Sequence, residues 1–354
     1  MFENIGDWLC KEGEFSDIVL SSRIRLARNI KGFPFAIKMK DKDREELLEI
    51  VKKAVEKVDI LREREYIDIS KIDPVKAQAL LERHLVSPDF LSARHPRGVF
   101  VSKDQTISLM VNEEDHLRFS VFAPGLGFDV AYKKINEIDD ELNKYLNYAF
   151  SKRLGYLTAC PTNVGTGLRA SVLIHLPGLV LTKEIEKVLK GVMQVGLSVR
   201  GIYGEGTETR GHFFQIANQV TLGLSETEII ENIKGMVVQL VTLERKARDF
   251  FMEKAKVELE DKIYRSYAIL RNARVITSEE VINLTSAVRL GIGLGIIKDI
   301  NLRTLNGILI LSQPANLQLY YKRVMSPQER DVKRAEFIRE RLNHRYKKGG
   351  SHEI

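Results

Sequence analysis

A cysteine begins the stretch of this sequence in which chemically active residue types are most concentrated. Residues 160–166 read CPTNVGT, and Arg169 follows nine positions after Cys160. The Thr162 hydroxyl could hydrogen-bond the sulfur as a thiolate, and the glycine suits a tight turn beside an anion. The segment therefore predicts a reactive thiol next to an anion-binding loop. The alternative is a buried cysteine that only begins a turn.

Arginines and carboxylates stand beside small or turn-forming residues in four other segments, which cover residues 22–25, 112–118, 199–201 and 204–206. One such arginine alone is usually a solvated surface charge. Several together favour a polyanion such as a triphosphate, which carries about four negative charges, because the planar guanidinium binds phosphoryl oxygens in pairs. The sequence contains neither a Walker-type phosphate loop nor the motif set of protein kinases. If ATP binds, arginine side chains must hold it.

The composition, 44% apolar and 29% charged, is that of a soluble globular protein. No apolar run reaches the roughly 20 residues of a membrane helix, and the N-terminus lacks the order of a signal peptide. Two cysteines, Cys10 and Cys160, provide no disulfide framework, which favours a cytoplasmic location. The net charge of +7 arises from basic residues mixed with acids, so we expect no membrane partner and no direct nucleic-acid binding.

Periodicity and capping signals predict the elements that must position these residues. Residues 15–28 begin as a strand in which Arg23 and Arg25 share one face and Ile24 takes the other. A helix capped by Asp43 follows. Beyond it we expect helices over 74–86, 130–150 and 183–194, and strands over 98–102, 106–112, 117–122, 156–158, 170–176, 197–202 and 213–217.

The C-terminal part is predicted to be helical. Residues 226–274 read as one or two long helices, Thr277 starts another, and Ser326 with Glu329 forms a capping box before a further helix. The sequence thus predicts an α+β fold. Residues 1–250 would form a catalytic domain with an antiparallel sheet flanked by helices, and residues 251–354 a helical C-terminal domain.

Residues 15–250 resemble the catalytic domain of the phosphagen (guanidino) kinases, the family of arginine and creatine kinases. Two motifs carry the resemblance, Cys-Pro-Thr-Asn-x-Gly-Thr at 160–166 and Asn-Glu-Glu-Asp-His-Leu-Arg at 112–118. The resemblance implies a phosphagen-kinase-like fold, ATP as phosphoryl donor and a guanidinium as acceptor. Mg²⁺ would arrive with ATP, held by phosphates and water, so we expect no metal site of the protein itself.

The resemblance also assigns site residues by their positions in these motifs. Glu114 and Glu205 match the carboxylates that bind and orient the guanidinium, and Cys160 matches the thiolate beside it. The residues that match ATP-binding positions are Arg23, Arg25, His84, Arg118, Arg169 and Arg200. Because a guanidinium with a pKa above ~12 is no nucleophile, a carboxylate must align it and take its proton as the N–P bond forms.

The sequence departs from the small-molecule phosphagen kinases in three ways. Twenty residues precede Ser21, where those enzymes carry a helical domain that closes over the free amino acid. Gly206 stands where a histidine usually follows the glutamate, and residues 251–354 have no counterpart. We interpret these differences as a site open to a large substrate. They match the bacterial McsB-type protein arginine kinases, which phosphorylate arginine side chains in proteins.

In that family a C-terminal Arg-Asp-x-x-Arg-Ala motif binds phosphoarginine allosterically, and here residues 330–335 read RDVKRA. Arg330 and Arg334 are four residues apart and share one helix face, beside Asp331. The resemblance therefore implies an allosteric phosphoarginine site at these three residues. Without it, the same residues would be a solvated charged face.

The sequence thus favours a protein arginine kinase that acts on proteins with exposed arginines. The resemblance further implies a homodimer built through the C-terminal domain, a zinc-binding activator, marking of proteins for a Clp ATPase and protease, and regulation of a heat-shock repressor in a stress response. Two alternatives stay open. One is a kinase of free L-arginine or another small guanidino compound, and the other is a non-catalytic adaptor that binds phosphoarginine.

Overall fold

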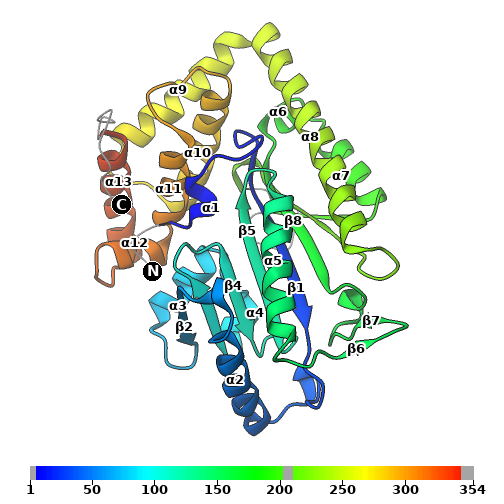
Figure 1. Ribbon diagram of the computed structural model, residues 1–354. Coiled ribbons are helices and arrows are strands. Elements are labelled where there is room, and N and C mark those ends of the chain that lie inside the picture. The colour runs from blue at the N-terminus through cyan, green and yellow to red at the C-terminus, as the bar shows by residue number, and fades with distance from the viewer. Residues whose placement is uncertain (1–4, 202–209, 344–354) are drawn as a thin grey trace.

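One antiparallel sheet organises the protein (Figure 1), whose computed structural model describes residues 5–201 and 210–343. The strands lie in the order β2-β3-β4-β5-β1-β8-β10-β9, and each neighbouring pair is antiparallel. Their bounds are β1 (Val19–Arg28), β2 (Arg64–Asp68), β3 (Gly98–Ser102), β4 (Ile107–Val111), β5 (Leu117–Pro124), β8 (Leu168–His175), β9 (Leu197–Gly201) and β10 (Phe213–Asn218). With its flanking helices this sheet confirms the predicted α+β fold.

Helices and short turns connect and cover the strands. The helices are α1 (Asp7–Cys10), α2 (Asp41–Val55), α3 (Pro74–Glu82), α4 (Pro88–Ser92), α5 (Phe128–Asn143), α6 (Pro177–Leu181), α7 (Ile185–Gln194) and α8 (Glu226–Lys254). The shorter elements are the 3-10 turns η1 (Ala36–Lys38), η2 (Asp59–Leu61), η3 (Pro161–Asn163) and η4 (Arg210–His212), and the hairpin of β6 (Phe150–Ser151) and β7 (Gly155–Tyr156).

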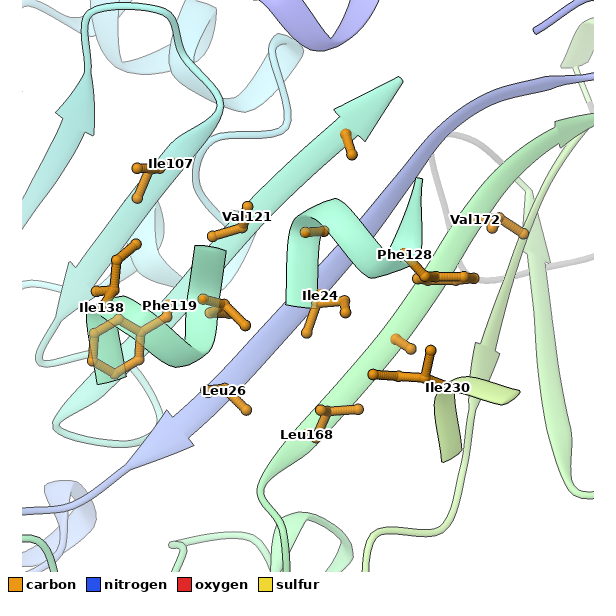
Figure 2. Close-up of a cluster of buried hydrophobic side chains, with 14 of the residues drawn as sticks. Ile24, Leu26, Ile107, Phe119, Val121, Phe128, Ile138, Leu168, Val172 and Ile230 are labelled. Carbon is orange, nitrogen blue, oxygen red and sulfur yellow. The ribbon is translucent and has the colours of Figure 1, made fainter. Parts of the chain in front are cut away.

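One face of the sheet is apolar and carries the main core. Because side chains alternate along a strand, Ile24 and Leu26 of β1 point to this face together with Val121 of β5 and Leu168 of β8. Helix α5 packs against them, and Figure 2 shows its Phe128 and Ile138 among these strand side chains. Helices α2 and α8 extend the same core on either side. The opposite face is therefore free to carry polar groups.

A second core joins α1, α3, α4 and α11 to the β2–β5 half of that opposite face, with Trp8, Leu80 and Phe122 among its members. These elements border the sheet face on one side without covering the arginines of β1. The C-terminal helices border it on another side. They are α9 (Lys256–Asn272), α10 (Ser278–Gly293), α11 (Leu302–Leu311), α12 (Pro314–Tyr320) and α13 (Pro327–Asn343).

The C-terminal helices share a hydrophobic core of their own that includes Ile263, Val288 and Phe337. Helix α8 leads into them and ends at Lys254, because its C-cap residue Ala255 has non-helical φ and ψ angles of −146° and 44°. The predicted division at residue 250 therefore lies within the last turns of α8. Contacts of α12 with α3, of α11 with α1 and of α10 with η4 join this helical unit to the sheet unit.

Several predicted boundaries need correction. Asp43 is the third residue of α2, where its carboxylate accepts a hydrogen bond from Lys40 N (3.1 Å), so the helix begins at Asp41 and not after Asp43. Helix α3 ends at Glu82 because His84 takes a left-handed φ of 59°. Helix α5 ends at Asn143, short of the predicted residue 150. The strand predicted at 156–158 is reduced to Gly155–Tyr156.

No helix in the ranges 5–201 and 210–343 combines the length and apolar character needed to cross a bilayer.

Candidate active site

Four of the predicted phosphate-binding arginines project from one face of the three central strands. Arg25 of β1 lies opposite Arg169 of β8, and Ala27 of β1 lies opposite Arg118 of β5. Arg23 lies two residues before Arg25 and shares its face. The fifth, Arg200 of β9, lies opposite Gln215 of β10, which in turn lies opposite Leu173 of β8 on the same face. The antiparallel register thus brings together arginines that are far apart in the sequence.

The contacts of these arginines leave much of their hydrogen-bonding capacity unused. Arg23 Nη2 donates to Ser120 Oγ (3.1 Å), and its guanidinium lies 4.9 Å from the centre of the Phe122 ring. Arg169 Nη2 donates to Ser198 Oγ (3.2 Å). Arg25 makes no hydrogen bond or ion pair with the described residues. The buried Nε atoms of all three lack a protein acceptor there.

Burial and mutual repulsion destabilise the charged forms of the arginines on this face. Desolvation together with the charges of Arg118 and Arg169 lowers the pKa of Arg23 to about 9, although Glu113 partly offsets the effect. Desolvation and the charges of Arg23, Arg118 and Arg169 also lower the pKa of Arg25 well below its usual value. Unsatisfied buried donors in a strongly positive field fit a ligand with several phosphoryl groups.

Arg118 is paired with a carboxylate. Its Nη1 donates to Glu113 Oε1 (2.5 Å), and Glu113 also accepts from Ser87 Oγ (2.6 Å). Despite desolvation, Arg118 and these hydrogen bonds lower the pKa of Glu113. Glu113 therefore stays ionised and fixes Arg118 in place.

A cleft of about 810 Å³ runs along the arginine face, within the size range of roughly 300–1,000 Å³ that is usual for ligand sites. Arg23, Arg25 and Arg200 line its floor. Its other walls come from α1, from α3 and the residues after it, and from the C-terminal helices, and include Trp8, Gln78, His84, Ser278, Ile282, Gln313 and Pro314. Arg118, Arg169, Glu114 and Cys160 do not line this cleft.

His84 borders the cleft and is neutral at physiological pH. Its ring lies edge-on to Trp8, with 6.5 Å between the ring centres, and Trp8 stacks on Phe122 at 4.9 Å. Desolvation and the charge of Arg23 lower the pKa of His84 to about 4. A neutral imidazole beside two aromatic rings suits a nucleobase or ribose better than a phosphate.

The predicted guanidinium-binding residues meet at one end of the sheet. Strands β5 and β8 both run antiparallel to β1, so the loops that precede them, residues 112–116 and 160–167, lie at the same end. There Asn163 Nδ2 donates to Glu114 Oε2 (3.4 Å), and Cys160 Sγ lies 3.0 Å from Thr162 Oγ1. Arg118 and Arg169 are the second residues of these two strands, so Glu114 and Cys160 lie at their end of the arginine face.

Glu114 is the exposed carboxylate of this region. Desolvation, followed by repulsion from Asp115 and Glu113, raises its pKa, whereas Arg118 and Asn163 act in the opposite direction. A cationic guanidinium bound beside it would remove this repulsion, so the site prefers a cation at the position next to Cys160. Glu205, its predicted partner, lies outside the described residues.

Asp115 holds the two loops together and escaped the assignment from sequence, although it lies in the 112–118 motif. Its carboxylate accepts from Ala159 N (2.7 Å), next to Cys160, and from Asn29 Nδ2 (2.6 Å) at the end of β1. Asn29 in turn accepts from His116 N (2.9 Å). These short buried hydrogen bonds fix the distance between the Glu114 and Cys160 segments.

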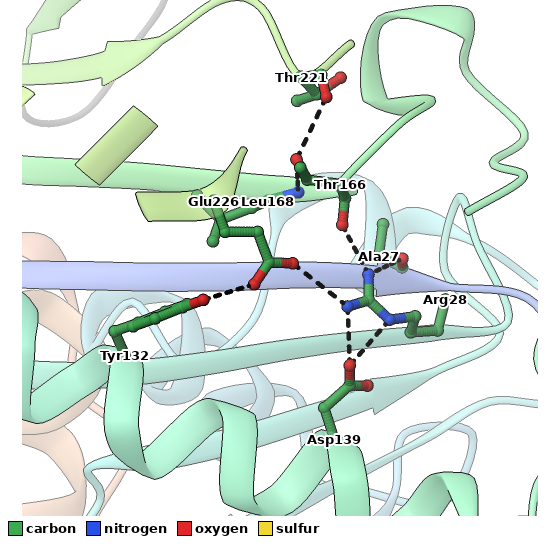
Figure 3. A network of polar contacts seen from close by, with 8 residues as sticks. All are labelled: Ala27, Arg28, Tyr132, Asp139, Thr166, Leu168, Thr221 and Glu226. Atoms are coloured by element: carbon green, nitrogen blue, oxygen red, sulfur yellow. Dashed lines mark hydrogen bonds and ion pairs between the residues drawn. The ribbon is translucent and has the colours of Figure 1, made fainter. Parts of the chain in front are cut away.

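A second buried network holds the loop of residues 160–167 on the side of α5 (Figure 3). Arg28, 1% exposed, donates from Nη1 to Thr166 O (2.9 Å) and from Nη2 to Asp139 Oδ2 (2.7 Å). Thr221 Oγ1 donates to Thr162 O (2.8 Å) and Val164 O (2.7 Å). Arg28 thus has a structural role, unlike Arg23 and Arg25 on the same strand.

The residues of the predicted phosphoarginine site lie on α13, away from the sheet. Arg334 is 1% exposed, and its guanidinium donates to Ser312 O (2.7 Å), to Ile276 O (2.9 Å) and to Asp331. Arg330 is half-buried and donates to Met325 O (3.2 Å). Arg330 therefore has spare donors, whereas Arg334 already holds α13 against the neighbouring helices.

No group of three potential metal ligands from His, Cys, Asp and Glu occurs in the part of the chain that the structure describes.

Comparisons with known proteins agree with this fold. Residues 46–247 match the family model described as ATP:guanido phosphotransferase, C-terminal catalytic domain. Residues 256–352 match the model described as the protein-arginine kinase McsB C-terminal domain. Fold and site together define a guanidino phosphotransferase, an enzyme class that matches the resemblance seen in the sequence.

Within that class, the chain belongs to the protein-arginine kinase family. It is 47% identical over 341 residues to the protein-arginine kinase of Geobacillus sp. (strain WCH70), covering 96% of this chain and 94% of that protein. To the protein-arginine kinase of Halothermothrix orenii it is 45% identical, with coverage of 96% and 97%.

Solved structures show the same catalytic fold. Lombricine kinase aligns with a TM-score of 0.58 and 27% identity, covering 68% of this chain and 71% of that one. The duplicated taurocyamine kinase from Schistosoma mansoni aligns with a TM-score of 0.61 and 25% identity, covering 78% and 41%.

The arginine repulsion generates a prediction for Arg25→Gln. Loss of one buried charge should stabilise the nucleotide-free protein by about 1 kcal/mol, a rise of roughly 2 °C in melting temperature. The same change should reduce the stabilisation that MgADP produces in a thermal-shift measurement. Arg94→Gln, which removes an exposed arginine, is the matched control and should change neither value. A full MgADP shift in Arg25→Gln would contradict the assignment.

His84 generates a prediction for the pH dependence of stability. Its pKa is about 4 in the folded protein and near 6.5 in the unfolded chain, so the unfolded state binds more protons between these values. Stability is therefore fully present above pH 6.5 and is lost as the pH falls towards 4. In urea unfolding at pH 7 and pH 5, His84→Gln should reduce this loss by about 2 kcal/mol. An equal loss in both proteins would mean that His84 is not desolvated.

Proposed function

We propose that this protein transfers the γ-phosphoryl group of ATP to the guanidinium of arginine side chains in proteins. The arginine face carries this proposal, because Arg23, Arg25 and Arg169 keep unpaired buried Nε donors, and the strands that hold them end at the loops of Glu114 and Cys160. Membership in the protein-arginine kinase family supports the choice of a protein as acceptor. ATP is the donor that the phosphotransferase family implies.

In this proposal the arginines bind the donor. Arg23, Arg25 and Arg200 would hold the triphosphate along the cleft, and Arg118 and Arg169 would face the transferred group at the end of the sheet. Their donors are positioned before ATP arrives, so little reorganisation is needed as charge moves in the transition state. Mg²⁺, bound to the phosphates, would neutralise charge on the β- and γ-oxygens.

Glu114 and Cys160 would bind the acceptor. The carboxylate of Glu114 aligns the guanidinium in line with the γ-phosphorus and takes a proton from the attacking nitrogen. The N–P bond forms as the bond from phosphorus to the ADP oxygen breaks. Cys160, hydrogen-bonded to Thr162, would stabilise the cation as a thiolate and form no covalent bond. We propose Glu205 as the second carboxylate on the basis of its sequence position.

The family resemblance supports further proposals about regulation. Arg330, Asp331 and Arg334 would bind phosphoarginine and stimulate the enzyme. Residues 251–354 would form a C-terminal domain through which two copies dimerise. Phosphorylated proteins would pass to a Clp ATPase and protease, with a heat-shock repressor among the targets and a zinc-binding protein as activator, all in the cytoplasm.

A substrate experiment tests the proposed activity. The protein is incubated with MgATP and an unfolded protein that contains arginines, and the phosphorylated sites are mapped after neutral or basic work-up. We expect acid-labile phosphate on arginine side chains, with much slower turnover of free L-arginine. Comparable turnover of free L-arginine would favour the small-molecule alternative. Absence of arginine phosphate, or labelling of Ser, Thr and Tyr alone, would contradict the proposal.

Glu114→Gln tests the role of the carboxylate. It should lower kcat/KM by about 10²–10⁴-fold, because it removes a general base, while MgADP binding persists. In the unaltered enzyme, the rate should fall as the pH drops through a pKa above the ordinary 4.5 of a glutamate. If the variant kept its biological effect in cells without kinase activity, the adaptor alternative would gain support.

Two substitutions in α13 separate regulation from folding. Arg330→Ala should abolish stimulation by added phosphoarginine without lowering the melting temperature. Arg334→Ala should lower the stability by on the order of 3 kcal/mol, because it leaves the buried carbonyls of Ser312 and Ile276 without a donor. Unchanged stimulation in Arg330→Ala would remove the allosteric proposal.

A further inference from the structure

A buried carboxylate links the nucleotide side of the cleft to the C-terminal helices. Glu82, the last residue of α3, is 6% exposed and accepts hydrogen bonds from Ala315 N (2.9 Å), Asn316 N (2.9 Å) and Asn316 Nδ2 (2.8 Å). These backbone N–H groups belong to the first turn of α12. Glu82 thus accepts the N-terminal N–H groups of α12, a capping role that a neighbouring side chain usually fills, although Ala315 lies 233 residues further along the chain.

The neighbouring arginine strengthens the same link. Arg83 Nε donates to Asn316 Oδ1 (2.6 Å), and Arg83 Nη1 donates to Gln105 Oε1 (2.9 Å). Arg83 is 2% exposed and Asn316 is also 2% exposed, so solvent does not compete for these bonds. Figure 1 shows α12 next to α3, and the two helices are in contact. We name Glu82, Arg83 and Asn316 the α3–α12 clamp.

The clamp lies between two parts of the cleft wall. His84 follows Arg83 directly, and its left-handed backbone turns the chain sharply at this point. On the other side, Gln313 and Pro314 immediately precede the clamped residues and line the same cleft as His84. The N-cap residue Gln313 makes no capping bond of its own, so the first turn of α12 depends on Glu82.

We propose that Glu82 is a positioning residue for nucleotide binding, which sets the distance between His84 and the Gln313–Pro314 wall. This makes the C-terminal helical unit a component of the nucleotide site. The inference rests on the proposed function only in that the cleft binds a nucleotide. Without the clamp, the first turn of α12 would expose buried N–H groups and move away from α3, which widens the cleft at its nucleobase end.

The chain contains a matched control. Glu244 of α8 is also buried and accepts from two backbone N–H groups at the start of α6, Gly178 N (2.9 Å) and Leu179 N (3.0 Å). An arginine, Arg248, pairs with it (2.7 Å), and α6 like α12 begins with a proline. The Glu244 clamp does not line the cleft. The two carboxylates therefore have the same chemistry at different places in the fold.

The test compares Glu82→Gln with Glu244→Gln by calorimetric titration with MgADP. Both variants should lose thermal stability. We expect Glu82→Gln to weaken MgADP binding about tenfold and to raise the KM for ATP by a similar factor at nearly unchanged kcat, whereas Glu244→Gln retains the affinity of the parent protein. Equal affinity in the two variants would overturn the proposal.

The milder variant Asn316→Ala tests the same clamp if Glu82→Gln does not fold. It removes one donor to Glu82 and the acceptor of Arg83, and it should weaken MgADP binding severalfold. Parent-like binding in Asn316→Ala would equally count against the clamp. If the parent protein itself failed to bind MgADP, the proposed function would fail instead, so the two failures are distinguishable.

Discussion

Repulsion among cations on one sheet face is the constraint on which the rest of the structure depends. In β1, Arg23 and Arg25 lie on one face of the sheet and Ile24 lies on the other. Because the apolar face packs against the core, the arginines are placed together on the opposite face. The fold accepts lowered pKa values at Arg23 and Arg25 instead of neutralising them with carboxylates. Glu113 forms an ion pair with Arg118. Such an arrangement is stable only because the large core beneath it supplies the free energy.

A buried carboxylate holds the surrounding segments in place at each end of the arginine face. At the end that carries Glu114, Asp115 joins two loops of the sheet unit through short buried hydrogen bonds. At the end that His84 borders, Glu82 joins the sheet unit to α12. In both cases an ionised acceptor satisfies backbone N–H groups, which fixes position more firmly than apolar packing would. Precise placement of donor and acceptor is what phosphoryl transfer requires from a protein.

The sequence predicts local features of this protein well and long-range ones poorly. Period-two alternation gave the correct face for Arg23 and Arg25, and the Ser326 capping box marked the start of α13. The same alternation places Arg28 on the face of Ile24 and Leu26, but its buried partners Asp139 and Thr166 come from distant segments and could not be predicted. The pairing of Glu82 with Asn316 depends on tertiary contact between distant segments. The early end of α3 follows from the left-handed backbone of His84, a conformation that no local pattern indicated.

If ATP binds the arginine face as proposed, it would relieve the repulsion there, and the lifetime of the folded protein would be coupled to the energy supply of the cell. A ligand that binds only the folded state stabilises it by about 2.7 kcal/mol at a hundredfold excess over its Kd. With plentiful ATP the cleft would be filled and unfolding would be rare. With scarce ATP the repulsion among the arginines would lower the stability of the folded protein, and a larger fraction of molecules would be unfolded and open to proteolysis. The abundance of the enzyme would then follow the supply of its own donor substrate.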